Sequence, residues 1–368
     1  MSVSLPASVI TATATDFEPA TYQKMCLNIE KKPGKDISFA GKIILHTTEI
    51  NSSYQKVYVL SPSDGGLSLL VDKAYGNLIV SPDGKWLAYS PLEYDTGNEN
   101  AKSFRVISID GKQKLDISYG EKDYGLFDWL DNHRVVLSSF GDDLLVADIL
   151  TGQVVKIGIT SPELAMNTNG LGFQAVNPAL DRMIYYRNIP AQEFPSAVLW
   201  DVENKKVIWR LELGDELVWH NLVQWSPDGS QFVIAGPVKL YDPVLELFLV
   251  DRDGQAKQLT HLRDSGVEHG IIDSPTWSPD GRHIAFWLEN SLAVFDSATE
   301  KVTDYCILAI GPNPPPMHWS PDSRQIVLHG SADSDGPKPV IVVDIKENKA
   351  VEVIGNEYSV EGWMVDNP

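Results

Sequence analysis

The stretch VQWSPDGSQFVIAG, residues 223–236, decides the fold because the chain repeats its pattern. The other copies are LIVSPDGKWLAYS (78–90), PTWSPDGRHIAFW (275–287) and MHWSPDSRQIVLHG (317–330). In such a turn proline fixes φ at the first position, aspartate bonds the nearby backbone, and glycine tolerates a left-handed exit. The flanking segments are rich in Val, Ile and aromatic residues, which favour strands. Each copy therefore predicts two antiparallel strands joined by a tight turn.

The copies belong to a longer repeat. The residues that precede the turn, or a degraded form of it, are Val80, Trp129, Val176, Trp225, Trp277, Trp319 and Trp363. Successive members of this series are 42 to 52 residues apart, which is typical of a four-stranded propeller blade. A third apolar strand and a short fourth strand follow each turn-linked pair. We expect the five tryptophans to pack between neighbouring blades.

The two ends of the repeat complete each other. The first repeat, GKIILHTTEI (41–50) and onward, lacks a recognisable first strand, while the chain ends on such a strand, YSVEGWMVDNP (358–368). We therefore predict an all-β fold, a seven-bladed β-propeller of four-stranded antiparallel blades. Its ring is closed by the C-terminal strand, which completes the first blade and leaves no open sheet edge. A six-bladed ring would leave one repeat unplaced.

The predicted domains are a Ser/Thr/Ala-rich N-terminal tether and lead-in over residues 1–33 and a single propeller domain over residues 34–368. The N-terminus lacks the charged start and apolar core of a signal peptide. Such a tether often follows a removed export signal or lipid anchor. We therefore expect an extracytoplasmic protein, in the periplasm or on the cell surface. A cytoplasmic protein with an irregular N-terminus is the alternative.

The chain is strongly acidic, because 50 Asp and Glu against 30 Lys and Arg give a formal net charge of −20. This charge argues against nucleic acid and anionic lipid as partners, since phosphate binding needs clustered Lys and Arg. No stretch reaches the roughly 18 apolar residues of a membrane-spanning helix. We expect a monomer without a transmembrane segment.

Cys26 and Cys306 are the only two cysteines of the chain. In an exported protein they form a candidate disulfide between the N-terminal segment and a late repeat. In the alternative interpretation they are two separately buried thiols.

The turn motifs resemble those of the TolB-like or PD40 class of WD40-like bacterial β-propellers. The resemblance covers about residues 34–368 and depends on Ser81–Gly84, Trp225–Gly229, Trp277–Gly281 and Trp319–Asp322. That class includes periplasmic scaffolds, the propeller halves of serine peptidases, and some polysaccharide lyases. The 33 leading residues are too few for the N-terminal domain of TolB, and no peptidase domain follows. The chain also lacks GxSxG, HExxH, P-loop and GxGxxG motifs.

Long, irregular links after the second and fourth strands of the blades are where we expect a binding site. The candidate ligand-binding residues on these links are His220, Asn221, Glu268, His269, Asp273 and His318. His220, His269 and His318 are candidate ligands for a divalent metal, which some propeller lyases of the resembling class bind through histidines. In the alternative interpretation these histidines only form hydrogen bonds, and His318 packs beside Trp319.

We expect a non-catalytic binding platform that recognises a protein or peptide, without a cofactor, in a bacterial cell envelope. Preordered loops lower the entropic cost of association. The rival hypothesis is an enzyme, a metal-assisted uronate lyase or another enzyme with its site at the propeller channel.

Overall fold

The structure is a computed structural model and describes residues 22–31, 38–48, 54–91, 102–120, 124–138, 143–158, 173–187, 195–214, 217, 220–309, 314–332 and 339–365. These residues form β-strands and no α-helix, as the all-β prediction requires. None of them belongs to a helix of the length and hydropathy needed to cross a lipid bilayer. The chain divides into two compact units.

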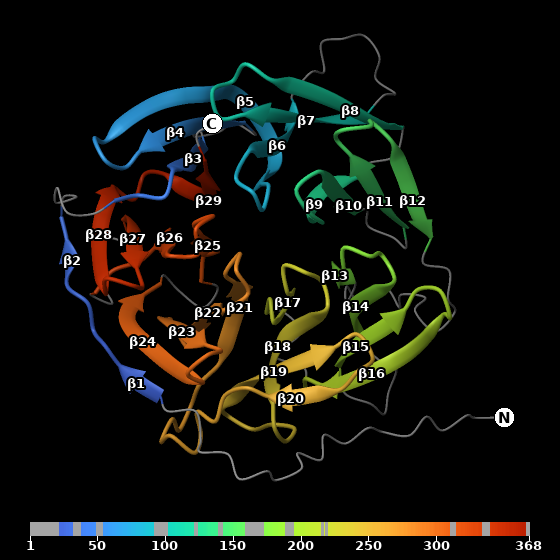
Figure 1. Cartoon of the computed structure of the whole chain (residues 1–368), viewed down its shortest axis with the longest axis vertical. Coiled ribbons are helices and arrows are strands. Elements are labelled where there is room, and N and C mark those ends of the chain that lie inside the picture. Colours follow the sequence, from blue (N-terminus) through green and yellow to red (C-terminus); the bar gives the residue numbers. More distant parts are fainter. Residues whose placement is uncertain are drawn as a thin grey trace. The chain divides into compact units, whose positions relative to one another are not determined.

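The first unit comprises Met1–Met25, Ser161–Trp277 and Gly281–Cys306. Its described residues form three sheets whose consecutive strands are hydrogen-bonded neighbours, as a blade requires. In hydrogen-bonding order they are β13 (Phe173–Val176), β14 (Arg182–Arg187), β15 (Ser196–Asp201) and β16 (Lys206–Glu212); β17 (Val223–Trp225), β18 (Gln231–Pro237), β19 (Leu245–Asp251) and β20 (Ala256–Gln258); and β21 (Ile272–Trp277), β22 (His283–Leu288), β23 (Ser291–Asp296), β24 (Lys301–Leu308) and β1 (Tyr22–Lys24). The first strands β13, β17 and β21 lie next to one another (Figure 1).

The second unit comprises Cys26–Thr160, Ser278–Asp280 and Ile307–Pro368. It also contains three sheets among its described residues. They are β9 (Gly125–Trp129), β10 (Arg134–Ser138), β11 (Asp143–Asp148) and β12 (Val154–Gly158); β25 (His318–Trp319), β26 (Gln325–His329), β27 (Val340–Asp344), β28 (Lys349–Ile354) and β2 (Ile29–Glu30); and β29 (Ser359–Met364), β3 (Lys42–Thr48), β4 (Gln55–Ser61), β5 (Gly66–Val80), β6 (Trp86–Pro91), β7 (Lys102–Ser108) and β8 (Lys114–Gly120).

The prediction of seven separate four-stranded sheets is wrong for the described residues, which form five sheets of four or five strands and one sheet of seven. The reason is the 15-residue strand β5. Residues 66–74 of β5 pair with β4, and residues 74–80 pair with β6. One continuous strand therefore joins what the repeat treats as the fourth strand of one blade and the first strand of the next. The strands β1 and β2 add parallel edges that the repeat also does not contain.

The expected pairing of the C-terminal strand is confirmed. β29 pairs antiparallel with β3, so that Ser359 lies opposite His46 and Trp363 opposite Ile43. Trp363 is 2% exposed. The last strand of the chain is therefore part of the core of the second unit.

The repeated turns form as predicted. In each SPD turn the serine Oγ donates to an aspartate Oδ1, at 2.6 Å from Ser226 to Asp228 and 2.7 Å from Ser81 to Asp83. The next residue adopts a left-handed conformation, with φ of 66° at Gly229. In the degraded turn at Asn177 the amide Oδ1 accepts backbone N–H groups that the serine Oγ would otherwise bind.

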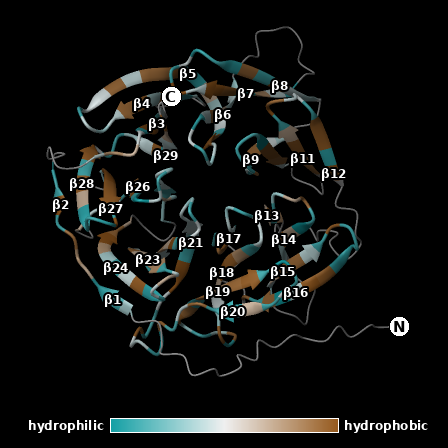
Figure 2. Ribbon diagram, viewed as in Figure 1, coloured by the Kyte–Doolittle hydropathy of each residue, from teal (hydrophilic) through white to brown (hydrophobic). Residues whose placement is uncertain are grey.

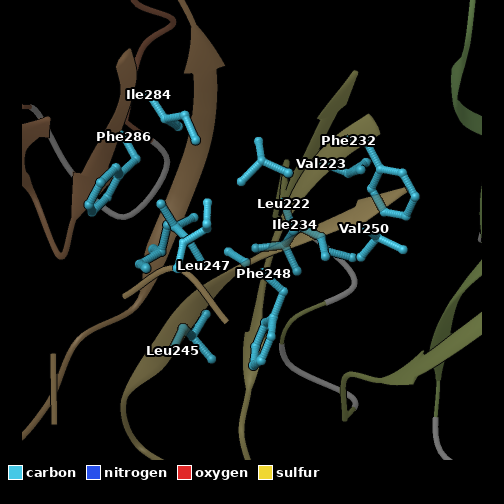
Figure 3. Packing of buried hydrophobic residues seen from close by; sticks show 14 of the residues in the cluster. Leu222, Val223, Phe232, Ile234, Leu245, Leu247, Phe248, Val250, Ile284 and Phe286 are labelled. Atoms are coloured by element: carbon cyan, nitrogen blue, oxygen red, sulfur yellow. The ribbon is translucent and has the colours of Figure 1, made fainter. Parts of the chain in front are cut away.

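Three anchor tryptophans join neighbouring first strands as expected. The indole Nε1 of Trp129 donates to the carbonyl of Ile79 at 3.0 Å, that of Trp363 to the carbonyl of His318 at 3.1 Å, and that of Trp277 to the carbonyl of Gln224 at 3.4 Å. The middle strands carry mainly hydrophobic residues (Figure 2). In the first unit Phe232, Phe248 and Phe286 belong to one buried hydrophobic cluster (Figure 3).

Candidate functional site

One end of the first unit gathers several of the candidate residues. His220 and Asn221 precede β17, and Asp273 lies near the start of β21. The backbone N–H of Ala235 donates to the carbonyl of Leu222 at 2.8 Å, so the end of β18 lies beside the same segment. The SPD turn that follows β17 lies at the opposite end of this sheet, because β17 and β18 are antiparallel. We call the residues around His220, the link 238–244 and the segment 262–274 the loop end.

His220 and Asp273 form the central contact of the loop end. Nδ1 of His220 lies 2.5 Å from Oδ2 of Asp273, and the two side chains are 19% and 9% exposed. The hydrogen bond with Asp273 raises the pKa of His220, although partial burial of the imidazole opposes this. A carboxylate at this distance favours the imidazolium form and orients the ring. Two residues that are 53 positions apart in the sequence are therefore locked together.

Asn221 and Ser274 complete the cluster. The backbone N–H of Ser274 donates to the carbonyl of Asn221 at 2.7 Å, and Ser274 Oγ donates to Oδ1 of Asp273 at 2.8 Å. The pairing of β21 with β22 is irregular between Asp273 and Thr276, and Ser274 has a φ of 50°. A bulge of this kind re-aims side chains and is common beside functional sites.

Tyr186 holds the segment that carries His220. Its hydroxyl donates to the carbonyl of His220 at 3.4 Å and accepts the N–H of Leu222 at 3.1 Å. Tyr186 is buried, so it positions the backbone and offers nothing to a ligand.

The cluster is not a nucleophilic triad. In a triad the serine hydroxyl is bonded to the imidazole that removes its proton. Here Ser274 donates to Asp273 instead, so both carboxylate oxygens are engaged and no serine is bonded to His220 among the contacts of the described residues. The cluster therefore fixes the shape and charge of a surface.

The buried carboxylate of Glu246 stabilises the turn at residues 260–263. Glu246 in β19 is 2% exposed, and it accepts hydrogen bonds from Thr260 Oγ1 at 2.6 Å and from the N–H groups of Leu262 at 3.0 Å and Arg263 at 3.1 Å. Burial raises its pKa, and these donors oppose the rise. Burying a charged group is costly unless it is well hydrogen-bonded, so this arrangement fixes the turn at residues 260–263.

The link between β18 and β19 is held to the segment 263–270 by an ion pair and by backbone hydrogen bonds. Asp242 forms an ion pair with Arg263. Leu245 N–H donates to the carbonyl of Gly270 at 2.8 Å, and Gly270 N–H donates to the carbonyl of Pro243 at 3.0 Å. The segments 242–245 and 263–270 are therefore held together.

Tyr241 is the most exposed large hydrophobic side chain among the described residues of the first unit. It is 70% exposed and has a φ of 64°. A left-handed conformation costs about 1–2 kcal/mol for a residue with a Cβ, and such outliers cluster at functional sites. Val238 is 50% exposed and Ile271 is 37% exposed on the adjoining segments.

Glu268 and His269 are the remaining candidate binding residues of the first unit. Glu268 and His269 are exposed on the segment that precedes Gly270. Among the described residues no three His, Cys, Asp or Glu side chains are placed to hold a metal ion together. Of the three candidate metal ligands, His220 and His269 lie in the first unit and His318 lies in the second.

His318 belongs to the second unit. Burial lowers its pKa to about 4, and its carbonyl accepts the indole N–H of Trp363. A neutral, packed imidazole is the alternative that the sequence left open for this residue.

Asp128 of β9 also belongs to the second unit. Part of its surface is exposed to solvent, but the protein around its carboxyl group desolvates it and raises its pKa to about 6.

Cys26 and Cys306, the candidate disulfide pair, are disulfide-bonded. Close by, β1 lies along β24, where the Tyr22 hydroxyl donates to Asp304 Oδ2 at 2.7 Å.

Tyr186, Ser274, Tyr241 and Glu246 are among the residues that sequence reasoning missed. Glu246 carries a signal, because it is the one charged residue in the apolar stretch LELFLV (245–250). The other three lack one, since their roles depend on backbone conformation and on segments that are distant in the sequence.

Comparisons with known proteins support the fold. No protein-family model matches the chain. The uncharacterized protein Atu1656 of Agrobacterium fabrum (strain C58) is 33% identical over 132 residues, which are 34% of this chain and 40% of that relative. The matched part thus spans less than half of the relative, whose name assigns no activity.

Solved structures with a similar fold include two oligogalacturonate lyases. One, in complex with manganese, has a TM-score of 0.51 and 16% identity, and the other, from Vibrio parahaemolyticus, has a TM-score of 0.50 and 14% identity; in each case 86% of this chain and 85% of that chain are covered. TolB from Acinetobacter baumannii has a TM-score of 0.44 and 13% identity, with 88% and 83% covered, which is too low to carry an argument. At such identities fold similarity does not transfer function. The chain therefore shares an all-β, propeller-type fold with these lyases.

Proposed function

We propose that the chain is a non-catalytic binding platform that recognises a protein or peptide through the loop end of its first unit. The observation that carries this proposal is that buried carboxylates hydrogen-bond to the segments that carry the exposed side chains. Glu246 and Asp273 are both almost fully buried, and their hydrogen bonds fix segments that present Asn221, Tyr241 and Glu268 to solvent. A preformed surface of this kind loses little conformational entropy on binding.

The chemistry of the cluster also supports binding over covalent catalysis. Ser274 is bonded to the carboxylate and not to the imidazole, so an activated serine is not assembled there. An aromatic side chain, an amide and exposed carboxylates are ordinary components of protein-recognition surfaces.

The alternative that we retain is a uronate lyase, because the fold is shared with two oligogalacturonate lyases. In such an enzyme His220, oriented by Asp273, would be the proton-transferring group. Oligogalacturonate with added Mn²⁺ is the direct assay, and formation of unsaturated uronides that disappears in the His220→Ala variant would support the enzyme over the platform.

A photo-crosslinking experiment tests the platform. A photoreactive amino acid replaces Asn221, which is exposed at the loop end, or Ser230, which is exposed in the SPD turn at the opposite end of the same sheet. We expect a discrete crosslinked protein, identified by mass spectrometry, from position 221 only. Identical products at both positions, or none at position 221, would contradict the proposal.

We further propose that the protein is extracytoplasmic and TolB-like. The disulfide between Cys26 and Cys306 supports this location, because disulfides persist in oxidising compartments. Alkylation of intact cells followed by mass spectrometry tests it: both cysteines should resist the reagent until a reductant is added.

We also propose seven blades, with the seven-stranded sheet providing two of them. The register shift in β5 between Tyr75 and Ile79 supports this count. In addition, Ile79 accepts the indole N–H of Trp129, as the first strands of other blades accept the indole of the following anchor. An experimental structure with a different number of blades would refute it.

A further inference from the structure

The link between β18 and β19 displays one aromatic side chain in an unusual way. Tyr241 is 70% exposed although its backbone is left-handed. It is followed by Asp242, whose side chain is 4% exposed and forms an ion pair with Arg263, and by Pro243, whose carbonyl accepts the N–H of Gly270. The conformation of Tyr241 is therefore imposed by fixed neighbours on its C-terminal side.

Besides the Asp242–Arg263 ion pair, the segments next to Tyr241 carry two exposed carboxylates and one exposed cation. The Asp242–Arg263 pair brings Tyr241 next to the segment that continues into Asp264, whose side chain is 69% exposed, and then into the exposed Glu268. Lys239 is an exposed cation of the same link. His261 Nδ1 lies 3.7 Å from Asp264 Oδ2. The Arg263 guanidinium is already engaged with Asp242.

The net negative charge of the whole chain also favours a cationic partner. A formal net charge of −20 produces a negative potential that attracts cationic partners and repels anionic ones. A tyrosine ring face attracts Arg and Lys side chains through a cation–π interaction. The exposed aliphatic side chains of Val238 and Ile271 offer contact for the long apolar stems of these residues.

From this combination we propose that Tyr241 is the anchor of a docking surface for a basic peptide segment, with an Arg or Lys side chain of the partner against its ring and further cations near Asp264 and Glu268. This inference rests on the proposed binding function and names the partner chemistry at that site. Tyrosine is a common binding hot spot because it combines a large contact area with few rotatable bonds.

Fluorescence anisotropy with two labelled peptides tests the inference. The probes are a twelve-residue peptide of alternating Arg, Lys and Gly and its counterpart with Glu at every cationic position. We expect saturable binding of the basic peptide, weakening as the salt concentration rises, and no binding of the acidic one. Equal binding of both peptides, no binding of either, or self-association of the chain through this surface in sedimentation would overturn the inference.

The Tyr241→Gly variant keeps the test independent of folding. Glycine adopts the left-handed conformation without strain, so the variant should keep the unfolding midpoint of the parent while its Kd for the basic peptide rises at least tenfold. Leu150→Ser is the matched control, because Leu150 is 71% exposed but lies in the second unit. Equal Kd values for both variants would overturn the inference. If Tyr241→Gly still yields the crosslinked partner from position 221, the proposed function stands and only this partner chemistry fails.

Discussion

Replacing Asp273 by asparagine should destabilise the protein in a pH-dependent way. The variant keeps the size of the side chain and an oxygen that can accept the Nδ1–H of His220, but it removes the negative charge. A hydrogen bond to a charged group contributes about 1.5–3 kcal/mol, and a neutral one about 0.5–1.5 kcal/mol. Since His220 and Asp273 are only 19% and 9% exposed, we expect the free energy of unfolding to fall by about 1–1.5 kcal/mol when His220 is protonated.

The sign of the pH dependence follows from His220. Its pKa is raised in the folded protein, mainly by the hydrogen bond with Asp273. The stabilisation is therefore fully present below the ordinary histidine pKa of about 6.5 and is lost as the pH rises through the higher folded value. The difference between parent and variant should be largest near pH 5.5 and smallest near pH 8.5, about one unit below and two units above that ordinary value. The bond from Ser274 to Asp273 weakens at both pH values and does not contribute to this trend.

Urea unfolding at the two pH values, followed by tryptophan fluorescence, measures the difference. NMR titration of the His220 Cε1–H resonance should also show a lower pKa in Asp273→Asn. The control is Asp264→Asn, which alters a more exposed His–Asp pair with a 3.7 Å contact to His261 and should change stability by less than about 0.5 kcal/mol because exposed pairs are screened. A destabilisation that is equal at both pH values, or larger at the higher one, would refute the role of the ion pair.

Three further predictions concern the fold. Trp363→Phe should lower the free energy of unfolding by about 2–3 kcal/mol in urea, because it leaves a cavity and removes the indole hydrogen bond to His318; an unchanged midpoint would contradict burial of the C-terminal strand. Ser226→Ala should cost about 1 kcal/mol, since its Oγ binds Asp228 and the backbone of the turn, and unchanged thermal unfolding would argue against this turn as a stabilising unit. Asp128→Asn should raise the melting temperature above about pH 6 and leave it unchanged near pH 4. The reason is that a carboxyl group with a raised pKa opposes folding once it ionises. A higher melting temperature only at acidic pH would show that folding lowers the pKa of Asp128.

Much of the fold was predictable because its determinants are local and repeated. The SPD turns need only residues that are adjacent in the sequence, and their serine–aspartate bonds form as the motif implies. The pairing of β29 with β3 was also predictable, because an unmatched strand at each end of a repeat leaves one economical solution. The joining of two repeats through β5 was not predictable, since a continuous strand and two strands separated by a bend have the same alternation of residues.

The candidate site was predicted in part. Its loop end could be identified from irregular links, and His220, Asn221 and Asp273 do meet there. The grouping of His220 and His269 with His318 in one metal site could not be judged from spacing. A period along the chain gives the strand on which a residue lies, but not the direction of its side chain or the burial that sets its pKa.

The amino-acid sequence alone determined the strand order, the turns and the tryptophan anchors, because these depend on short-range backbone preferences and on a hydrophobic pattern repeated along the chain. Only the tertiary structure decided that Asp273 binds His220, that Glu246 braces the link carrying Tyr241, and that Tyr241 is held outward in a left-handed conformation. These features arise where segments distant in the sequence meet, and there packing and the cost of burying charge outweigh local preference.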